Sequence, residues 1–323
     1  MSQSVESRPL ERVGHELPAA VGTSTRQEPP GVPTSPKGAG HGQDHPRLRF
    51  WNRRRLVVAA VAFLAGVTLA VVPYALRGQP GAKPLAAAMR TLGAAAVTQS
   101  SPPSSSGLHY RYPDAGVYEL TGQGSEHISF PPSSQHDSSI MPGSISILKG
   151  GCWRWRVDYN VAHWEFYDFC PTSGALVLEG NDNSQTWSFG LFKISNLAHF
   201  TCSSGTVWLP ASAAPDLLPA YSCTGANTAV AGLTTATTTI HVTGVAILTI
   251  DGQHVRAVEE QDNTVLSGGQ RGTVAETWWL DLQNGMPIRM QRSMSIATDS
   301  PLGQIDYSEF GHWQMDYLVP QIG

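Results

Sequence analysis

Two hydrophobic patterns divide this chain. From Leu108 to Pro320, short runs rich in β-branched and aromatic residues are bounded by Gly, Pro, Asn and Asp, which is typical of strands separated by turns. The short connections favour antiparallel pairing. The second pattern is a continuous run of 21 residues without a charge, Leu56–Leu76. We therefore expect a mainly β domain, with few helices and one large curved antiparallel sheet, that follows a single apolar helix.

The uncharged run, Leu56–Leu76, has the length of a transmembrane helix. At about 1.5 Å per residue it would be roughly 31 Å long, which matches a bilayer core. More basic residues precede it closely than follow it, so the positive-inside rule places residues 1–55 in the cytoplasm and the chain from residue 77 outside. The alternatives are a buried helix of a soluble protein and a cleaved signal peptide, whose apolar core is shorter. We interpret the run as a single-pass signal anchor in the cell membrane.

The segments around this run differ in composition. Residues 1–55 are rich in Pro, Gly and charge and lack apolar periodicity, which predicts a disordered cytoplasmic tail. Residues 77–107 contain an Ala-rich stretch, Lys83–Gln99, that predicts one helix, and then a Ser/Pro spacer. The extracytoplasmic β domain is expected to cover residues 108–320.

Charge separates the two sides of the predicted anchor. Residues 1–55 carry 9 basic and 5 acidic residues, a net charge of +4, whereas residues 108–323 carry 9 basic and 20 acidic residues, a net charge of −11. An acidic outer domain argues against a nucleic-acid partner, because nucleic acids bind basic surfaces. The partner that the sequence indicates is the membrane, and nothing in it identifies a protein partner.

Two hairpins in the second half of the chain can be placed in register. A three-residue loop at Gln283–Gly285 pairs apolar residues with apolar ones and one acid with one base, whereas a shorter loop would not. A two-residue turn, Asp251–Gly252, closes the other hairpin. The predicted partners are Leu282–Met286, Leu280–Ile288, Trp278–Met290, Glu276–Arg292 and Val274–Met294 in the first hairpin, and Leu248–Val255 and Val245–Val258 in the second.

The stretch CWRWRVDYNVAHWEFYDFC, residues 152–170, predicts a third hairpin. Facing residues of a hairpin share a side of the sheet. A turn around Asn160–Ala162 therefore puts most of the aromatic residues on one face and both cysteines on the other, which is mostly polar but also carries Trp164 and Phe166. The predicted partners are Cys152–Cys170, Trp153–Phe169, Arg154–Asp168, Trp155–Tyr167, Asp158–Trp164 and Tyr159–His163.

All four cysteines follow the predicted anchor. An even number of cysteines outside the cytoplasm indicates two disulfides, for which three pairings are possible. The hairpin register favours Cys152 with Cys170, which leaves Cys202 for Cys223. The first bridge would stabilise the domain by roughly 3 kcal/mol in the chain-entropy model.

No motif in the sequence predicts catalysis, a cofactor or a metal. Gly-x-Ser-x-Gly, His-Glu-x-x-His and the glycine-rich phosphate-binding loops are absent, as are the closely spaced Cys and His pairs of zinc sites. Glycosidases use two carboxylates, but we interpret the acidic residues at the predicted strand ends as solvated. We therefore expect no enzyme, no catalytic residue, no cofactor and no metal. The acids considered are Glu259, Glu260, Asp262, Asp306 and Glu309.

The apolar face of the predicted sheet has two interpretations. Large aromatic and methionine side chains can fill a solid core, or they can line a cavity for an apolar ligand. The hairpin registers place one set of candidates for ligand contact on this face. They are Trp153, Trp155, Tyr159, Trp278, Leu280, Ile288 and Met290.

Residues 240–318 resemble a known family. The segments GVAILTIDGQHVRAVEE, TWWLDLQNGMPIRM and SPLGQIDYSEFGHWQM look like the late hairpins of the LolA/LppX-like lipoprotein-carrier superfamily. This resemblance implies a half-barrel of antiparallel strands, closed by helices, with an apolar cavity for acyl chains. The anchor and the disulfides depart from that pattern. The whole outer domain also resembles uncharacterised single-pass membrane proteins of high-GC Gram-positive bacteria.

The sequence thus favours a non-enzymatic, membrane-anchored extracytoplasmic domain that binds a lipid or another amphipathic ligand of the cell envelope. The first alternative is a regulatory or scaffold module that acts through protein contacts, with the tail as its cytoplasmic output. The second alternative is a carbohydrate-active enzyme.

Overall fold

The computed structural model describes residues 79–94, 112–172, 175–210, 216–300 and 303–322. All of them belong to the second of two compact units, Val61–Gly323; the first unit, Met1–Ala60, lies outside the described residues. The predicted cytoplasmic tail and the predicted anchor, residues 1–55 and 56–76, lie outside them as well. Within the described residues, no helix combines the length and apolar character that a membrane span requires.

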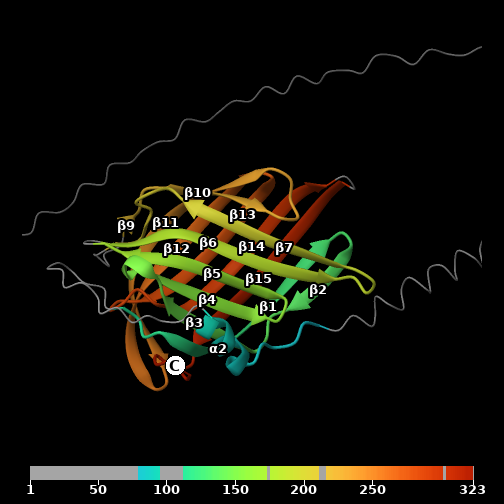
Figure 1. The fold of residues 1–323 in the computed structure, drawn as a ribbon. Coiled ribbons are helices and arrows are strands. Elements are labelled where there is room, and N and C mark those ends of the chain that lie inside the picture. Colours follow the sequence, from blue (N-terminus) through green and yellow to red (C-terminus); the bar gives the residue numbers. More distant parts are fainter. Residues whose placement is uncertain (1–78, 95–111, 173–174, 211–215, 301–302, 323) are drawn as a thin grey trace, which may run out of the picture. The chain divides into compact units, whose positions relative to one another are not determined.

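Most of the described residues form antiparallel strands (Figure 1). The mainly β prediction is confirmed. The strands are β1 Gly116–Ser129, β2 Pro132–His136, β3 Ile140–Ile147, β4 Trp153–Asn160, β5 His163–Pro171, β6 Ala175–Ser188, β7 Lys193–Cys202, β8 Val207–Pro210, β9 Asp216–Leu217, β10 Tyr221–Asn227, β11 Leu233–Ile250, β12 Gln253–Gly268, β13 Gln270–Asp281, β14 Pro287–Ser300 and β15 Gly303–Met315.

Twelve of these strands close into a barrel. Their order is β10-β7-β6-β5-β4-β3-β1-β15-β14-β13-β12-β11, and β11 pairs back with β10. The predicted half-barrel is therefore wrong, because β10 is paired along both edges, with β7 and with β11. The short strands β2, β8 and β9 attach to β1, β6 and β11.

The β11–β12 hairpin forms as predicted. Asp251 and Gly252 have φ of 48° and 71°, as a two-residue type I′ turn requires. Leu248 lies opposite Val255, which confirms the register, and Val245 lies opposite Val258.

The β13–β14 hairpin is confirmed along most of its length and wrong at its tip. Glu276 pairs with Arg292 and Trp278 with Met290, and Val274 pairs with Met294, but an irregularity after Trp279 puts Leu280 opposite Pro287 instead of Ile288. Side chains within the turn explain the shift. Asp281 accepts a hydrogen bond from the Gln283 amide at 3.0 Å, and Asn284 accepts one from the Met286 amide at 2.9 Å. The loop is therefore longer than predicted, and the predicted Leu282–Met286 pair does not form.

The β4–β5 hairpin also differs only at its tip. Trp153–Phe169, Arg154–Asp168, Trp155–Tyr167 and Asp158–Trp164 pair as predicted, whereas His163 lies opposite Asn160 and not Tyr159. The Asn160 side chain accepts a hydrogen bond from the Ala162 amide at 2.7 Å, a local turn that the alternation of apolar residues does not specify.

Both predicted disulfides are present. Cys152 bonds to Cys170 beside the β4–β5 pair, and Cys202 bonds to Cys223. Because Cys202 and Cys223 lie opposite each other on β7 and β10, the second bridge fastens the strand pair next to the point of closure.

The helix α2, Leu85–Ala94, packs on the outside of the barrel, within the predicted helix 83–99. Ala88 and Leu92 are buried in a small cluster with Val117 of β1. Just before α2, Lys83 forms an ion pair with the buried carboxylate of Asp158 at 3.0 Å. These contacts hold the segment against β1 and β4.

The interior of the barrel has two halves that differ in packing. In an up-and-down barrel, alternate turns lie at the same end, so the turns at 251–252 and 282–286 mark one end. The interior of this half is filled by large buried side chains, and we call it the packed half. The turns at 129–132, 188–193 and 268–270 mark the other end, which we call the cavity half. The packed half contains Trp153, Trp155, Phe169, Trp278, Leu280, Ile288, Met290, Trp313 and Met315.

Candidate ligand-binding cavity

A cavity of about 320 Å³ occupies the cavity half. Its walls are formed mainly by apolar side chains from many strands, and its inner end carries charged groups. Pockets of this kind, apolar with a few converging polar groups, are the usual sites for small ligands. The apolar lining includes Ile128, Leu178, Trp187, Phe200, Trp208, Leu266, Val274, Met294, Ile296 and Ile305.

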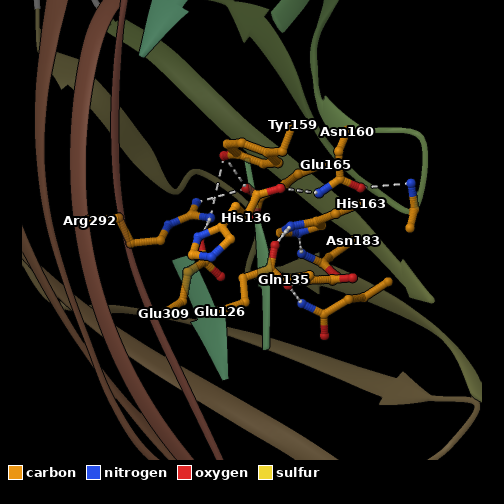
Figure 2. Close-up of polar contacts among 12 residues, drawn as sticks. Glu126, Gln135, His136, Tyr159, Asn160, His163, Glu165, Asn183, Arg292 and Glu309 are labelled. Atoms are coloured by element: carbon orange, nitrogen blue, oxygen red, sulfur yellow. Dashed lines mark hydrogen bonds and ion pairs between the residues drawn. The ribbon is translucent and has the colours of Figure 1, made fainter. Parts of the chain in front are cut away.

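Arg292 separates the cavity from the packed half. It projects inward from β14, and its guanidinium reaches Glu165 of β5 at 2.7 Å, although β5 lies on the opposite side of the ring. It also pairs with Glu276 at 2.6 Å and with Glu309 at 3.3 Å, on the two strands that flank β14. Figure 2 shows Arg292 facing Glu165 and Glu309 beneath the ring of Tyr159. One buried cation thus pairs with three glutamates, of which Glu165 and Glu309 are buried and Glu276 is nearly so.

Tyrosine hydroxyls complete the coordination of Arg292. The guanidinium donates a hydrogen bond to Tyr167 at 2.8 Å, and Tyr159 donates one to Glu165 at 3.0 Å. Burial raises the pKa of both tyrosines well above the usual value, so their hydroxyls stay neutral. Burial opposes the charge on Arg292, but the neighbouring carboxylates outweigh it and raise the pKa of Arg292. The guanidinium is therefore a permanent charge at the inner end of the cavity.

A second buried pair, Glu126 with His163, lies beside this network (Figure 2). The His163 Nδ1 atom is 2.7 Å from a Glu126 oxygen. Burial disfavours the imidazolium, but Glu126 outweighs burial and raises the pKa of His163 to about 9. Burial likewise opposes the Glu126 carboxylate, yet His163 and hydrogen bonds from Gln135 and Gln185 hold its pKa below the usual value. The pair is charged and internally balanced.

Asp137 joins this pair in a cluster that could hold a metal ion. Ligand atoms of Glu126, Asp137 and His163 lie within 4.8 Å of one another. Burial, reinforced by the charge on Glu126, raises the pKa of Asp137 to about 7. Gln135 and Asn183 already contact Glu126 and His163 at 2.7 and 3.0 Å, so an ion would have to replace existing hydrogen bonds. The prediction of no metal remains a prediction.

Glu260 and Asp262 on β12 have no counter-charge. Both side chains are buried, and none of their four carboxyl oxygens has a hydrogen-bond partner. Burial, and then neighbouring acids, raises the pKa of each well above the usual value. Asp262 lines the cavity directly and lies opposite Glu276 in the β12–β13 register.

Six of the candidate residues from the sequence lie in the packed half, and Tyr159 lies at the boundary, next to Arg292. All seven are buried, and none lines the cavity. Their role as ligand contacts stays a prediction, while the cavity draws its walls from other residues. They are Trp153, Trp155, Tyr159, Trp278, Leu280, Ile288 and Met290.

The interpretation of the five acidic residues as solvated is wrong for three of them. Glu260, Asp262 and Glu309 are buried inside the barrel, while Asp306 is exposed and Glu259 bonds to the Trp279 indole on the outer side. The signal was present in the sequence. The predicted hairpin register puts Glu276 and Arg292 on the same face as Trp278, so charge on the inner face followed from the predicted pairing.

Comparisons with known proteins give little further information. No family model matches the chain, and no curated protein matches it. Among solved structures it is similar to the hypothetical lipoprotein YmcC from Escherichia coli, at 13% identity over 59% of this chain and 83% of that chain, with a TM-score of 0.30. A likeness this weak carries no argument. The resemblances to LolA/LppX-like carriers and to Gram-positive membrane proteins remain predictions.

Proposed function

We propose that this barrel is a non-enzymatic binding domain that holds an amphipathic ligand of the cell envelope in its interior cavity. The observation that carries the proposal is the cavity itself, about 320 Å³, with apolar walls and a charged inner end. A ligand with an apolar body and one polar group would match both parts. Apolar burial alone contributes about 25 cal/mol per Å² removed from water.

Exposed apolar side chains around the cavity end support this proposal. Phe130 lies in the β1–β2 turn, Leu191 and Phe192 lie in the β6–β7 turn, and Leu233 begins β11; all four are exposed. Because alternate turns of an antiparallel barrel share an end, these side chains surround the same opening. Exposed apolar groups gathered at one place commonly mark contact with a membrane, a ligand or a partner.

The disulfides support an extracytoplasmic location. Both bridges are formed, and the described residues contain no free cysteine. Such bridges persist in oxidising compartments and are rare in the cytoplasm. The proposed anchor, residues 56–76, would keep the barrel next to the membrane surface, where amphipathic molecules are concentrated.

Filling the cavity tests the proposal. Ala236 of β11 lines the cavity, whereas Ala275 of β13 is exposed on the outer side. The full chain would be purified from a membrane fraction and analysed by native mass spectrometry for bound lipid. We expect a co-purified amphiphile in the wild-type chain and in Ala275→Trp, and its loss in Ala236→Trp. Absence of any bound amphiphile in the wild type, or equal occupancy in both variants, would contradict the proposal.

A further inference from the structure

The charges inside the barrel do not balance. Among the described residues, the buried basic side chains are Arg292 and His163. His163 is matched by Glu126 at 2.7 Å. Arg292 is already shared among three glutamates. Glu260 and Asp262 therefore remain without a positive group.

Stability gives no reason for these two carboxyl groups. A buried polar group without a partner costs about 1–3 kcal/mol, and two neighbouring acids raise that cost because they repel each other when ionised. Keeping protons on them removes the charge but leaves the oxygen atoms unpaired. Groups that destabilise a fold in this way commonly serve a ligand, and Asp262 lies in the wall of the cavity.

Their position selects the part of the ligand that they would contact. Glu260 and Asp262 are two residues apart on β12 and share its inward face, with Trp278 and Glu276 opposite them on β13. Asp262 lies in the wall at the inner end of the cavity, next to Glu276 and Arg292, and Glu260 lies one inward position further toward the packed half. The exposed apolar side chains Phe130, Phe192 and Leu233 lie at the opposite, outer end of the cavity half. A molecule that enters with its polar group first would bring that group to Asp262 and leave its apolar part along the wall.

We infer that the ligand carries a protonated amine, and that Asp262, supported by Glu260, is its binding partner. This inference rests on the proposed function, because it names the polar group of the ligand that the cavity would hold. An ammonium group supplies the missing charge and donates hydrogen bonds to oxygens that have none. An anionic group, such as a fatty-acid carboxylate, would add to the acidic excess.

Three probes of equal chain length separate the inference from the proposed function. Octylamine, octanol and octanoate would be titrated by calorimetry into the full chain in phosphatidylcholine nanodiscs, with empty nanodiscs as the blank. We expect octylamine to bind at least about tenfold more tightly than octanol, as a buried charge pair warrants, and octanoate to bind weakest. If octanol equals octylamine, the inference is overturned and the apolar cavity stands. If none of the three binds, the proposed function fails too.

Asp262→Asn is the decisive variant, because it removes the charge and keeps the shape. The variant should bind octylamine at least about tenfold more weakly than the wild type and bind octanol with the same affinity. Unchanged affinity for octylamine would overturn the inference. The octanol titration also reports that the barrel is folded, and Glu260→Gln provides a second variant with the same expected pattern. The matched control is Glu259→Gln, an equal change of charge on the outer side of the same strand, which should alter neither probe.

The pH dependence gives an independent readout. Burial, and then neighbouring acids, raise the pKa of both carboxyl groups, so a group that holds a proton must release it to pair with the ammonium. Octylamine affinity should therefore rise with pH, by up to about tenfold per unit, while octanol affinity stays flat. A flat profile for octylamine would contradict the role of Asp262.

Discussion

The packed half and the cavity half are built from the same strands, yet they differ in what fills them. On β14, Met290 lies in the core, Arg292 is the next inward residue, and Met294 and Ile296 line the cavity two and three inward positions beyond Met290. On β15, Trp313 lies in the core and Ile305 lines the cavity. In the packed half, large aromatic rings from different strands pack against one another and fill the interior. In the cavity half, the aromatic rings of Trp187, Phe200 and Trp208 stand among medium-sized side chains, and a space remains.

Arg292 marks the boundary between the halves. Its ion pairs span the lumen from β14 to β5, so it joins opposite walls at the level where the aromatic core ends. We therefore expect the packed half to account for most of the stability, and the network at the boundary to fix the inner end of the cavity. Variants in each half should separate these two roles.

The largest expected effect comes from the packed half. Trp278 is buried among Tyr167, Trp208 and Trp313, with ring centroids 5.5–6.1 Å away. Trp278→Ala should lower the free energy of unfolding by about 3–5 kcal/mol, because it leaves a large void. Trp187→Ala, which enlarges an existing cavity, should cost clearly less. Urea denaturation of the full chain, followed by circular dichroism, measures both; equal losses would mean that the halves do not differ in packing.

The boundary should show the next largest effect. Arg292→Met removes the cation that pairs with Glu165, Glu276 and Glu309 and should lower the free energy of unfolding by about 3 kcal/mol or more at pH 7. In the variant, unpaired buried carboxylates take up protons more readily when folded than when unfolded. The difference in unfolding free energy between the wild type and the variant should therefore become smaller as the pH falls from 7 toward 5. Thermal melts of both chains across this range test the expectation, and a deficit independent of pH would contradict it.

Substitutions that enlarge a side chain should have the smallest effects on stability, and they compare how tightly the two halves are packed. At Gly143 in the packed half, a new Cβ would lie 2.4 Å from the Trp155 ring, so Gly143→Ala should cost about 1–3 kcal/mol through overpacking. Val274→Leu, which extends into the cavity, should cost less than about 1 kcal/mol. The difference between the two unfolding free energies is the test. A costly Val274→Leu would show that the cavity wall is as tightly constrained as the core.

The local pairings followed from the sequence because they depend on alternation and turn chemistry. Trp278 opposite Met290, and Leu248 opposite Val255, are fixed by their own hairpins. The closure of the barrel could not be predicted from such local patterns. It requires β1 to pair with β15, which places Leu120 opposite Met315, a residue far away in the sequence. Nothing in the local pattern of either strand specifies that pairing.

Of the contacts in the candidate site, only those between neighbouring strands could be predicted from the sequence. The register gave Glu276 and Arg292 as neighbours, but Glu165 reaches Arg292 across the lumen. Contacts of this kind depend on barrel diameter and strand order, which alternation does not determine. The unpaired state of Glu260 and Asp262 likewise becomes visible only once every surrounding strand is in place.

Closure of the ring also limits how another protein could bind this domain. In the described part of the chain, each of the twelve ring strands has a neighbour on both sides, so little free edge is left to which a partner could add a strand. One stretch is an exception, because Val245–Ile250 of β11 pair as a strand with β12 alone. The short strand β2 pairs with β1 beyond the end of β3, and the side chain of Gln79 bonds to the backbone of Ser134 and His136 on it. Strand exchange, fibril growth and peptide capture by β-augmentation are therefore disfavoured where both edges of a ring strand are paired. Strand addition by a partner protein would be confined to the open stretch of β11.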